Sequence, residues 1–153
     1  MHETEALHIR RLTVEDLEPL HRLLSDPAVM RYLEPPFTRA QTEAFLQKAG
    51  MGREPLIRAV EDGRGFAGYV IYHPYDETSM ELGWVLASDR WGRGYALALT
   101  RQMICRARES GRDAVIECHP QQAATRHIAE KLGFRPCGMD GGCCVYRLAG
   151  KNE

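Results

Sequence analysis

Apolar and polar residues follow strand and helix periodicities along almost the whole chain, and the pattern predicts a definite order of elements. Strand-like alternation or short apolar runs occupy residues 7–12, 56–60, 66–72, 80–86, 114–118, 134–137 and 143–148. Apolar residues recur at helical spacing over residues 13–24, 38–48, 96–107 and 121–132. This order predicts a mixed α/β fold. Its centre is a mixed, mostly antiparallel sheet of about seven strands, with helices on both faces.

Residues with capping and turn chemistry separate these elements. Thr13 is a predicted N-cap with Asp16 three residues later, and Asp26-Pro27 is predicted to end the first helix. Thr38 is the predicted cap of the second helix. Segment 61–65 is predicted to join a hairpin, and segment 74–78 forms the next predicted turn.

Length and composition are those of an ordinary soluble domain. The chain has 153 residues, of which 44% are hydrophobic and 27% charged, so we expect a single domain over residues 1–153. A net charge of −1 gives no basic footprint for nucleic acid. The sequence contains no apolar run of membrane-spanning length and no signal-peptide pattern, so we expect a cytoplasmic protein without a membrane partner.

The five cysteines do not form the pattern of a disulfide framework, because their number is odd and two of them are adjacent. A zinc site is conceivable from Cys118, His119, Cys137, Cys143 and Cys144, but the paired spacings typical of zinc ligands are missing. We therefore predict no metal, and we interpret the cysteines as small buried side chains.

The segment Arg90–Ala96, with the sequence Arg-Trp-Gly-Arg-Gly-Tyr-Ala, carries the most specific chemistry. A glycine-bearing turn between a strand and a helix directs backbone N–H groups toward one point, and this arrangement binds phosphate. Neither the Walker pattern nor the dinucleotide pattern fits, because only one residue separates Gly92 from Gly94 and Leu97 replaces the third glycine. The alternative interpretation is a glycine that merely starts the helix.

Three segments, in order and at appropriate distances, carry a family resemblance. They are Ile9–Asp16 followed by Leu24–Leu33, then Trp91–Ala96, and finally Gln122–Phe134 with its Glu-Lys-Leu-Gly-Phe ending. Over residues 7–148 the chain resembles the GNAT N-acetyltransferase superfamily, and within it the ribosomal-protein N-terminal acetyltransferase branch (RimJ/RimL-like). The resemblance implies direct transfer of an acetyl group from acetyl-CoA to a primary amine.

The resemblance also implies where acetyl-CoA binds. Strands 80–86 and 114–118 are expected to splay apart, and pantetheine is expected to pair with the backbone of the first strand. Arg90 and Arg93 are expected either to meet the nucleotide phosphates or to be solvated. In the helix over 122–134, Gln122 replaces the family's Asn, Thr125 replaces its Ser, and Ala129 stands where many members have a tyrosine. The implied acetyl-CoA residues are Val85, Leu86, Ala87, Arg90, Trp91, Gly92, Arg93, Gly94, Tyr95, Ala96, Gln122 and Thr125.

Acetyl transfer needs a base for the amine and donors for the developing oxyanion. Glu81 is the main candidate base, because this branch commonly places a carboxylate there, and Glu117 is the second candidate. Thr125 is a candidate for holding the thiolate or a water. His119 and His127 are alternative bases, and a cysteine nucleophile would favour Cys118.

The acceptor amine is not identified by the sequence. In this family the 26–48 region and the last strands shape the acceptor pocket, which points to Arg31, Tyr32, Tyr72 and Tyr146. An α-amine, with a pKa of about 8, loses its proton more easily than a lysine, which favours a peptide N-terminus or a small-molecule amine. Two alternatives stay open: a longer acyl-CoA, and a non-catalytic acyl-CoA-binding module. Strand 143–148 is a candidate edge for a homodimer.

Overall fold

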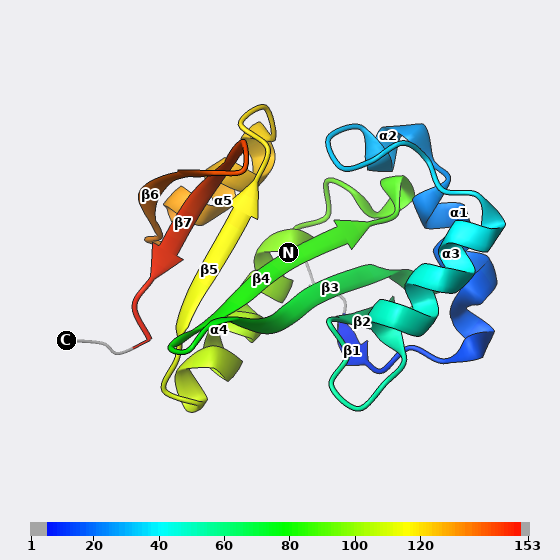
Figure 1. Cartoon of the computed structure of the whole chain (residues 1–153), viewed down its shortest axis with the longest axis horizontal. Coiled ribbons are helices and arrows are strands. Elements are labelled where there is room, and N and C mark those ends of the chain that lie inside the picture. The colour runs from blue at the N-terminus through cyan, green and yellow to red at the C-terminus, as the bar shows by residue number, and fades with distance from the viewer. Residues whose placement is uncertain (1–5, 151–153) are drawn as a thin grey trace. The chain divides into compact units, whose positions relative to one another are not determined.

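The computed structural model describes residues 6–150 and contains one seven-stranded sheet with the strand order β1-β2-β3-β4-β5-β7-β6 (Figure 1). The strands are β1 His8–Arg10, β2 Ile57–Asp62, β3 Gly65–Asp76, β4 Ser79–Leu86, β5 Asp113–Cys118, β6 Arg135–Asp140 and β7 Cys143–Leu148. The helices are α1 Leu17–Leu24, α2 Pro27–Met30, α3 Arg39–Phe45, α4 Tyr95–Glu109 and α5 Ala123–Lys131. Shorter helical turns are η1 Val14–Asp16, η2 Leu46–Gly50 and η3 Ser88–Arg90. The predicted mixed α/β fold is confirmed.

The chain divides into two compact units. The first unit contains the residues up to Ile71 together with Trp84–Tyr95. The second unit contains Tyr72–Gly83 together with the residues from Ala96 onward.

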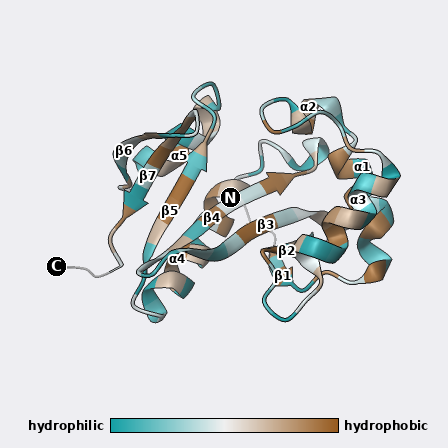
Figure 2. Ribbon diagram, viewed as in Figure 1, coloured by the Kyte–Doolittle hydropathy of each residue, from teal (hydrophilic) through white to brown (hydrophobic). Residues whose placement is uncertain are grey.

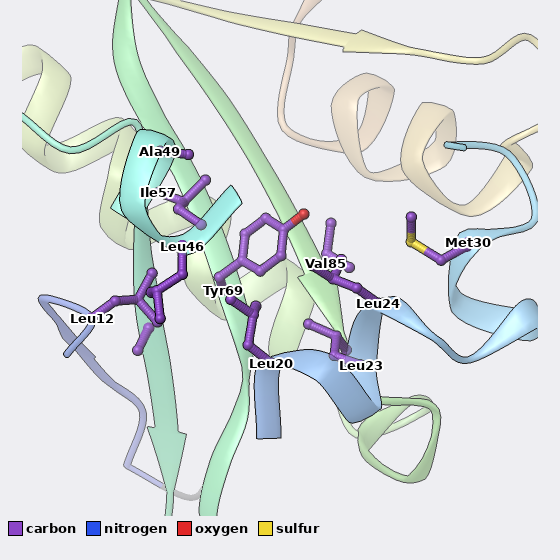
Figure 3. Close-up of a cluster of buried hydrophobic side chains, with 11 residues drawn as sticks. Leu12, Leu20, Leu23, Leu24, Met30, Leu46, Ala49, Ile57, Tyr69 and Val85 are labelled. Atoms are coloured by element: carbon purple, nitrogen blue, oxygen red, sulfur yellow. The ribbon is translucent and has the colours of Figure 1, made fainter. Parts of the chain in front are cut away.

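The core of the first unit forms where α1, α2 and η2 cover β2, β3 and the end of β4 (Figure 3). Helix α1 is amphipathic and presents Leu20, Leu23 and Leu24 to this core, so burial of its apolar face drives its packing. The remaining members of the core cluster are Leu12, Met30, Leu46, Ala49, Ile57, Ala59, Tyr69 and Val85. Hydrophobic and hydrophilic residues are interleaved along α1 and α3 in Figure 2, as expected for helices with one solvated face.

The predicted capping at Thr13 and Thr38 is confirmed, and so is the predicted end of the first helix before Asp26-Pro27. Both threonines form capping boxes, with Asp16 and Gln41 respectively. Helix α1 ends at Leu24 as predicted, and Asp26-Pro27 in addition starts a short helix, α2, that the sequence pattern did not predict. Asp26 caps it, and Pro27 takes the first position, where a missing N–H costs nothing.

The predicted turn over 74–78 is wrong in extent, because β3 continues through Pro74 to Asp76 and only two residues separate it from β4.

Gly68 allows β3 to approach β4 closely. Its φ is +147°, and an added Cβ would lie 2.1 Å from the carbonyl oxygen of Val85. A side chain at this position would therefore push against the backbone of β4 near its end.

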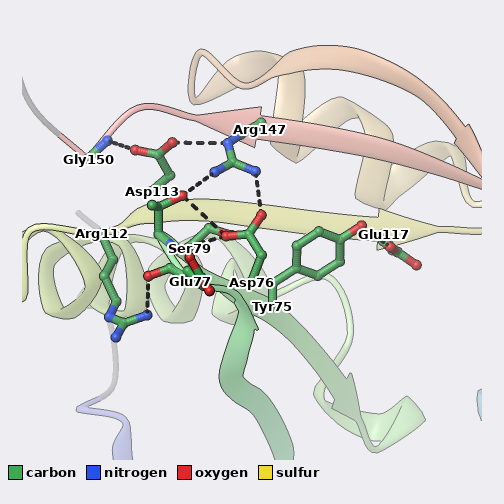
Figure 4. A network of polar contacts seen from close by, with 10 residues as sticks. Tyr75, Asp76, Glu77, Ser79, Arg112, Asp113, Glu117, Arg147 and Gly150 are labelled. Atoms are coloured by element: carbon green, nitrogen blue, oxygen red, sulfur yellow. Dashed lines mark hydrogen bonds and ion pairs between the residues drawn. The ribbon is translucent and has the colours of Figure 1, made fainter.

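In the second unit, β5 pairs in parallel with the start of β4 and antiparallel with β7. The guanidinium of Arg147 on β7 ties these strands to the β3–β4 turn through ion pairs to Asp76 (3.2 Å) and Asp113 (3.0 Å) and a hydrogen bond to Thr78 (Figure 4). The predicted dimer edge is wrong, because β7 pairs on one side with β5 and on the other with β6. The outer strand is β6, all of whose residues are exposed.

Within residues 6–150, no helix is both long enough and apolar enough to cross a membrane. The interpretation of the cysteines as buried side chains holds only for Cys118, since Cys105 and Cys137 are exposed and the other two are partly exposed.

Candidate active site

The glycine turn contains two residues in the left-handed backbone region. Gly92 and Gly94 have φ values of +75° and +80°, which side chains rarely adopt, and α4 begins directly afterwards at Tyr95. Among the described residues, none accepts a hydrogen bond from the backbone amides of Gly92, Arg93 or Gly94. The turn leads directly into the N-terminus of α4, so it combines N–H donors with the positive end of a helix dipole.

Arg90 and Trp91, at the start of the turn, both form polar contacts with other residues of the first unit. Arg90 is buried, and its guanidinium forms ion pairs with Asp62 (2.9 Å) and Asp89 (3.1 Å). The indole ring of Trp91 is half exposed, while its Nε1 donates a hydrogen bond to the carbonyl oxygen of Leu86 at 2.9 Å. Arg93 is exposed, and its guanidinium forms no hydrogen bond or ion pair with the residues that the structure describes.

Of the three residues expected to pair with pantetheine, Leu86 has the suitable backbone direction. The amide of Ala87 donates to the carbonyl of Ala67 on β3 at 2.9 Å. Successive residues of an extended chain direct their N–H and C=O groups to opposite edges. The backbone of Leu86 therefore faces away from β3, and those of Val85 and Ala87 face toward it.

Asp62 is a residue that the sequence reasoning missed. Its side chain is fully buried at the end of β2 and accepts hydrogen bonds from Arg90 and from the hydroxyl of Tyr95. The guanidinium of Arg90 holds the pKa of Asp62 well below its ordinary value. In sequence Asp62 is only one residue of a hairpin turn, and nothing in the pattern connects it with residues about 30 positions later.

In the second unit, Glu81 on β4 is partly buried beside a second carboxylate. Burial raises the pKa of Glu81 above its ordinary value, and the nearby charge of Glu117 raises it further, whereas His73 opposes the shift. The side chain of Glu81 retains 25% exposure, so water still reaches it. A carboxylate in this environment is a stronger base than one in water.

His73 was also missed, because the sequence reasoning considered only His119 and His127 as alternative bases. Its Nε2 lies 3.5 Å from Oε1 of Glu81, and its Nδ1 lies 2.9 Å from the carbonyl oxygen of Pro74. A carbonyl only accepts, so Nδ1 carries a proton and donates it to Pro74. Nε2 is therefore the ring nitrogen that faces the Glu81 carboxylate.

Glu117 on β5 is engaged differently from Glu81. Its Oε2 accepts a hydrogen bond from the hydroxyl of Tyr75 at 2.7 Å (Figure 4). That bond raises the pKa of Tyr75 to about 12, because the neutral phenol is the donor. Glu117 therefore has one oxygen committed to a neighbour.

The other predicted catalytic and pantetheine residues lie around α5. Gln122 accepts a hydrogen bond from the amide of His119 at 2.8 Å and so holds the loop that precedes the helix. Thr125 is partly buried near the start of the helix, and His127 is exposed. Cys118 is buried, and burial raises the pKa of its thiol to about 11, which disfavours the thiolate that a nucleophile needs.

The four predicted acceptor residues have different surroundings. In the first unit, the guanidinium of Arg31 stacks 5.1 Å from the centroid of the Tyr32 ring. In the second unit, Tyr72 and Tyr146 are both buried. The hydroxyl of Tyr146 lies 3.4 Å both from Nε of Arg126 and from Oε2 of Glu130, so it is bound to α5.

The first unit also contains a cavity of about 630 Å³. Its walls come from α1, from α2 with its Asp26 cap, from the start of β3 and from the segment 87–90 that leads into the glycine turn. Within residues 6–150, no three His, Cys, Asp or Glu side chains are grouped so that they could hold a metal ion.

Comparisons with known proteins add to this geometry. The family model described as "Acetyltransferase (GNAT) domain" matches residues 6–135. An N-acetyltransferase of Bacillus subtilis strain 168, YnaD, itself uncharacterised, is 26% identical over 145 residues, which cover 92% of this chain and 85% of that protein. A GNAT-family acetyltransferase from Bacillus anthracis is 25% identical, with a TM-score of 0.80 and 97% of each chain covered. The spermidine N-acetyltransferase of Vibrio cholerae, solved with CoA and spermine, has a TM-score of 0.74 over 93% of each chain. Its identity is only 22%, so the likeness concerns the fold.

Proposed function

The chain belongs to the acetyltransferase (GNAT) family, and from this premise we propose that it transfers the acetyl group of acetyl-CoA directly to a primary amine, with Glu81 as the general base. N-acetylation dependent on acetyl-CoA is the general activity of the family, and the chain is an N-acetyltransferase. The observation that carries the residue-level proposal is the partly buried carboxylate of Glu81, whose pKa is raised and which faces Nε2 of His73 at 3.5 Å.

For the donor, we propose that the turn Gly92–Ala96 binds the pyrophosphate of acetyl-CoA. Within residues 6–150 the backbone amides of Gly92, Arg93 and Gly94 donate to no protein acceptor, and together with the N-terminus of α4 they support this assignment. Arg93 is the proposed arginine for the nucleotide phosphates, because Arg90 is occupied by Asp62 and Asp89. Leu86 is the proposed backbone partner of pantetheine, and Trp91 is proposed to fix the carbonyl of Leu86.

For the base, the proposed sequence of proton transfers begins with an ammonium, which has no lone pair for attack. Glu81 accepts a proton from the ammonium, directly or through one water, and the raised pKa makes this transfer less unfavourable. The amine nitrogen then forms the new C–N bond as the C–S bond breaks, and the electron pair of that bond leaves with the thiolate. The second N–H proton is lost to the thiolate or to solvent. His73 can receive the first proton from Glu81 on Nε2 and so restore the carboxylate.

Glu117 and Thr125 have supporting roles in this proposal. Glu117, held by Tyr75, places a second negative charge near Glu81, which attracts a cationic amine and keeps the pKa of Glu81 raised. Thr125 offers a hydroxyl at the start of α5 for the leaving thiolate or a water. A thiol has an ordinary pKa of about 8.5, so its departure needs little acid assistance, and the absence of a tyrosine at Ala129 is tolerable.

The proposed acceptor is a primary amine that is protonated in solution, either a peptide N-terminus or a small-molecule amine. The paired carboxylates favour a cationic acceptor over a neutral one. Arg31, Tyr32 and Tyr72 stay as proposed acceptor contacts. Tyr146 is proposed only to line the acceptor pocket, because its hydroxyl forms hydrogen bonds with side chains of α5. Membership of the ribosomal-protein branch and a cytoplasmic location stay predictions.

The test is thiol release from acetyl-CoA across a panel of peptide N-termini, polyamines and other small amines, with mass spectrometry of the product.

Glu81→Gln is expected to lower kcat/KM at pH 7 by about 100-fold or more, with partial recovery at high pH, where the amine deprotonates unaided. The matched control is Glu77→Gln, since Glu77 is an exposed glutamate of the β3–β4 turn. An equal loss at every pH would refute the assignment of Glu81 as base. Tight CoA binding without turnover on any amine would support the non-catalytic acyl-CoA-binding module. Turnover only with a longer acyl-CoA would support the other alternative.

A further inference from the structure

Asp62 has a buried carboxylate that forms hydrogen bonds with the residues at both ends of the glycine turn. Its side chain has 0% exposure and lies at the end of β2, outside the turn itself. A buried charge is stable only when its oxygens are fully hydrogen-bonded or paired. Oδ2 accepts from Nε of Arg90 at 2.9 Å and from the hydroxyl of Tyr95 at 2.8 Å, and Oδ1 accepts from Nη2 of Arg90 at 3.2 Å. Oδ1 also accepts from the amide of Arg64 at 2.8 Å.

Two of these partners, Arg90 and Tyr95, stand on either side of the glycine turn in the sequence. Arg90 directly precedes the segment Trp91–Gly94, and Tyr95 directly follows it as the first residue of α4. One carboxylate therefore fixes both ends of a four-residue segment that contains two glycines. Glycine gives a segment more conformational freedom than any other residue, so an untethered turn of this composition would be poorly ordered.

We propose that Asp62, through Arg90 and Tyr95, is the positioning residue that holds the Trp91–Gly94 turn in its phosphate-binding conformation. This inference rests on the proposed binding of acyl-CoA at the turn. A binding site gains affinity when its donors are ordered before the ligand arrives, because the ordering cost is then not taken from the binding energy. Asp62 touches neither the acetyl group nor the amine in this role, so it governs affinity for CoA and not the chemical step.

A purely structural role for the network predicts different behaviour. If Asp62 only stabilised the fold, loss of a hydrogen bond would lower the stability of the whole chain and leave CoA affinity unchanged in the folded fraction. Tyr95→Phe is the most selective variant, because it removes one hydroxyl and leaves the buried ring and the Arg90–Asp62 pair in place. Tyr69→Phe is the matched control, since Tyr69 is also a buried tyrosine of the first unit but is not among the hydrogen-bond partners of Asp62.

The experiment measures three quantities for the wild type, Tyr95→Phe, Asp62→Asn and Tyr69→Phe. These are the dissociation constant of CoA by calorimetry, the steady-state constants, and the exchange rates of backbone amides in the ligand-free protein. Tyr95→Phe is expected to raise the Kd of CoA and the KM of acetyl-CoA about tenfold, with kcat and the acceptor KM unchanged. Its amides at 91–94 are expected to exchange faster than those of the wild type, and Tyr69→Phe is expected to match the wild type. Asp62→Asn should show the same pattern more strongly.

Unchanged CoA affinity and unchanged amide exchange in Tyr95→Phe would overturn the proposal, even if Asp62→Asn did not fold. Faster exchange spread evenly over the chain would also overturn it, because that result indicates a structural role. If the wild type did not bind CoA at all, the proposed function would fail, and this inference with it. Binding by the wild type with no effect in Tyr95→Phe removes this inference alone.

Discussion

The close approach of β3 to β4 at Gly68 gives a sharp quantitative prediction for the variant Gly68→Ala. The added Cβ would lie 2.1 Å from the carbonyl oxygen of Val85 and 2.8 Å from the Cα of Leu86, far inside ordinary van der Waals contact. Both contacts are backbone, so no side-chain rotation relieves them. The strand β4 must shift, or β3 must bend.

Two costs contribute to the expected loss of stability. Placing a side chain at φ +147° costs about 1–3 kcal/mol in backbone strain, and overpacking costs about 1–3 kcal/mol more. The control is Gly65→Ala, which also has a positive φ, +109°, but no atom within 4 Å of the added Cβ. The difference between the two variants therefore isolates the clash, about 1–3 kcal/mol, or roughly 3–10 °C in Tm for a chain of this size.

Stability is measured by thermal and urea unfolding of both variants, and affinity by the KM for acetyl-CoA. Because the clash is at Val85 and Leu86, we expect Gly68→Ala also to raise the KM for acetyl-CoA, while Gly65→Ala leaves it unchanged. A Gly68→Ala protein that is no less stable than Gly65→Ala would refute the reasoning from close backbone approach.

Two further predictions concern titratable side chains. The folded-state pKa of Glu81 is raised, so its charged form destabilises the fold progressively as pH rises through that pKa. Glu81→Gln should therefore raise Tm relative to wild type at pH 8 but hardly at pH 4, and an equal shift at both pH values in thermal melts would contradict the burial argument. Cys118 has a pKa of about 11, so we expect Cys118→Ala to keep its turnover rate and Cys118 of the wild-type enzyme to resist alkylation by iodoacetamide at pH 7.5, as read by mass spectrometry of its peptide. Loss of most activity in Cys118→Ala would point instead to an acetyl-cysteine intermediate.

The sequence was sufficient where local chemistry decides the structure. The capping boxes at Thr13 and Thr38 and the positive φ of Gly92 and Gly94 follow from residues within a few positions of each other. Local patterns also predicted most of the strand and helix positions. They gave the wrong extent for the 74–78 turn, because proline is read as a turn residue although it is tolerated in a strand where its missing N–H is not needed.

Contacts over long sequence separations could not be predicted in the same way. The pairing of Arg90 with Asp62 spans 28 positions, and it removes Arg90 from the expected set of phosphate contacts. The sequence alone does not identify His73 as a partner of Glu81, because the contact depends on how β3 and β4 are paired. The direction of the Leu86 backbone likewise depends on which neighbouring strand receives the amide of Ala87.

The half-exposed indole of Trp91 has a practical consequence for measuring ligand binding. The chain contains two tryptophans, Trp84 and Trp91, so its whole indole emission originates from β4 and the turn that follows. Trp91 is 50% exposed, and its emission is sensitive to any group that replaces water next to it. A titration with CoA followed at an excitation of about 295 nm therefore needs no label, and Trp84→Phe would leave one indole as a reporter within the glycine turn itself.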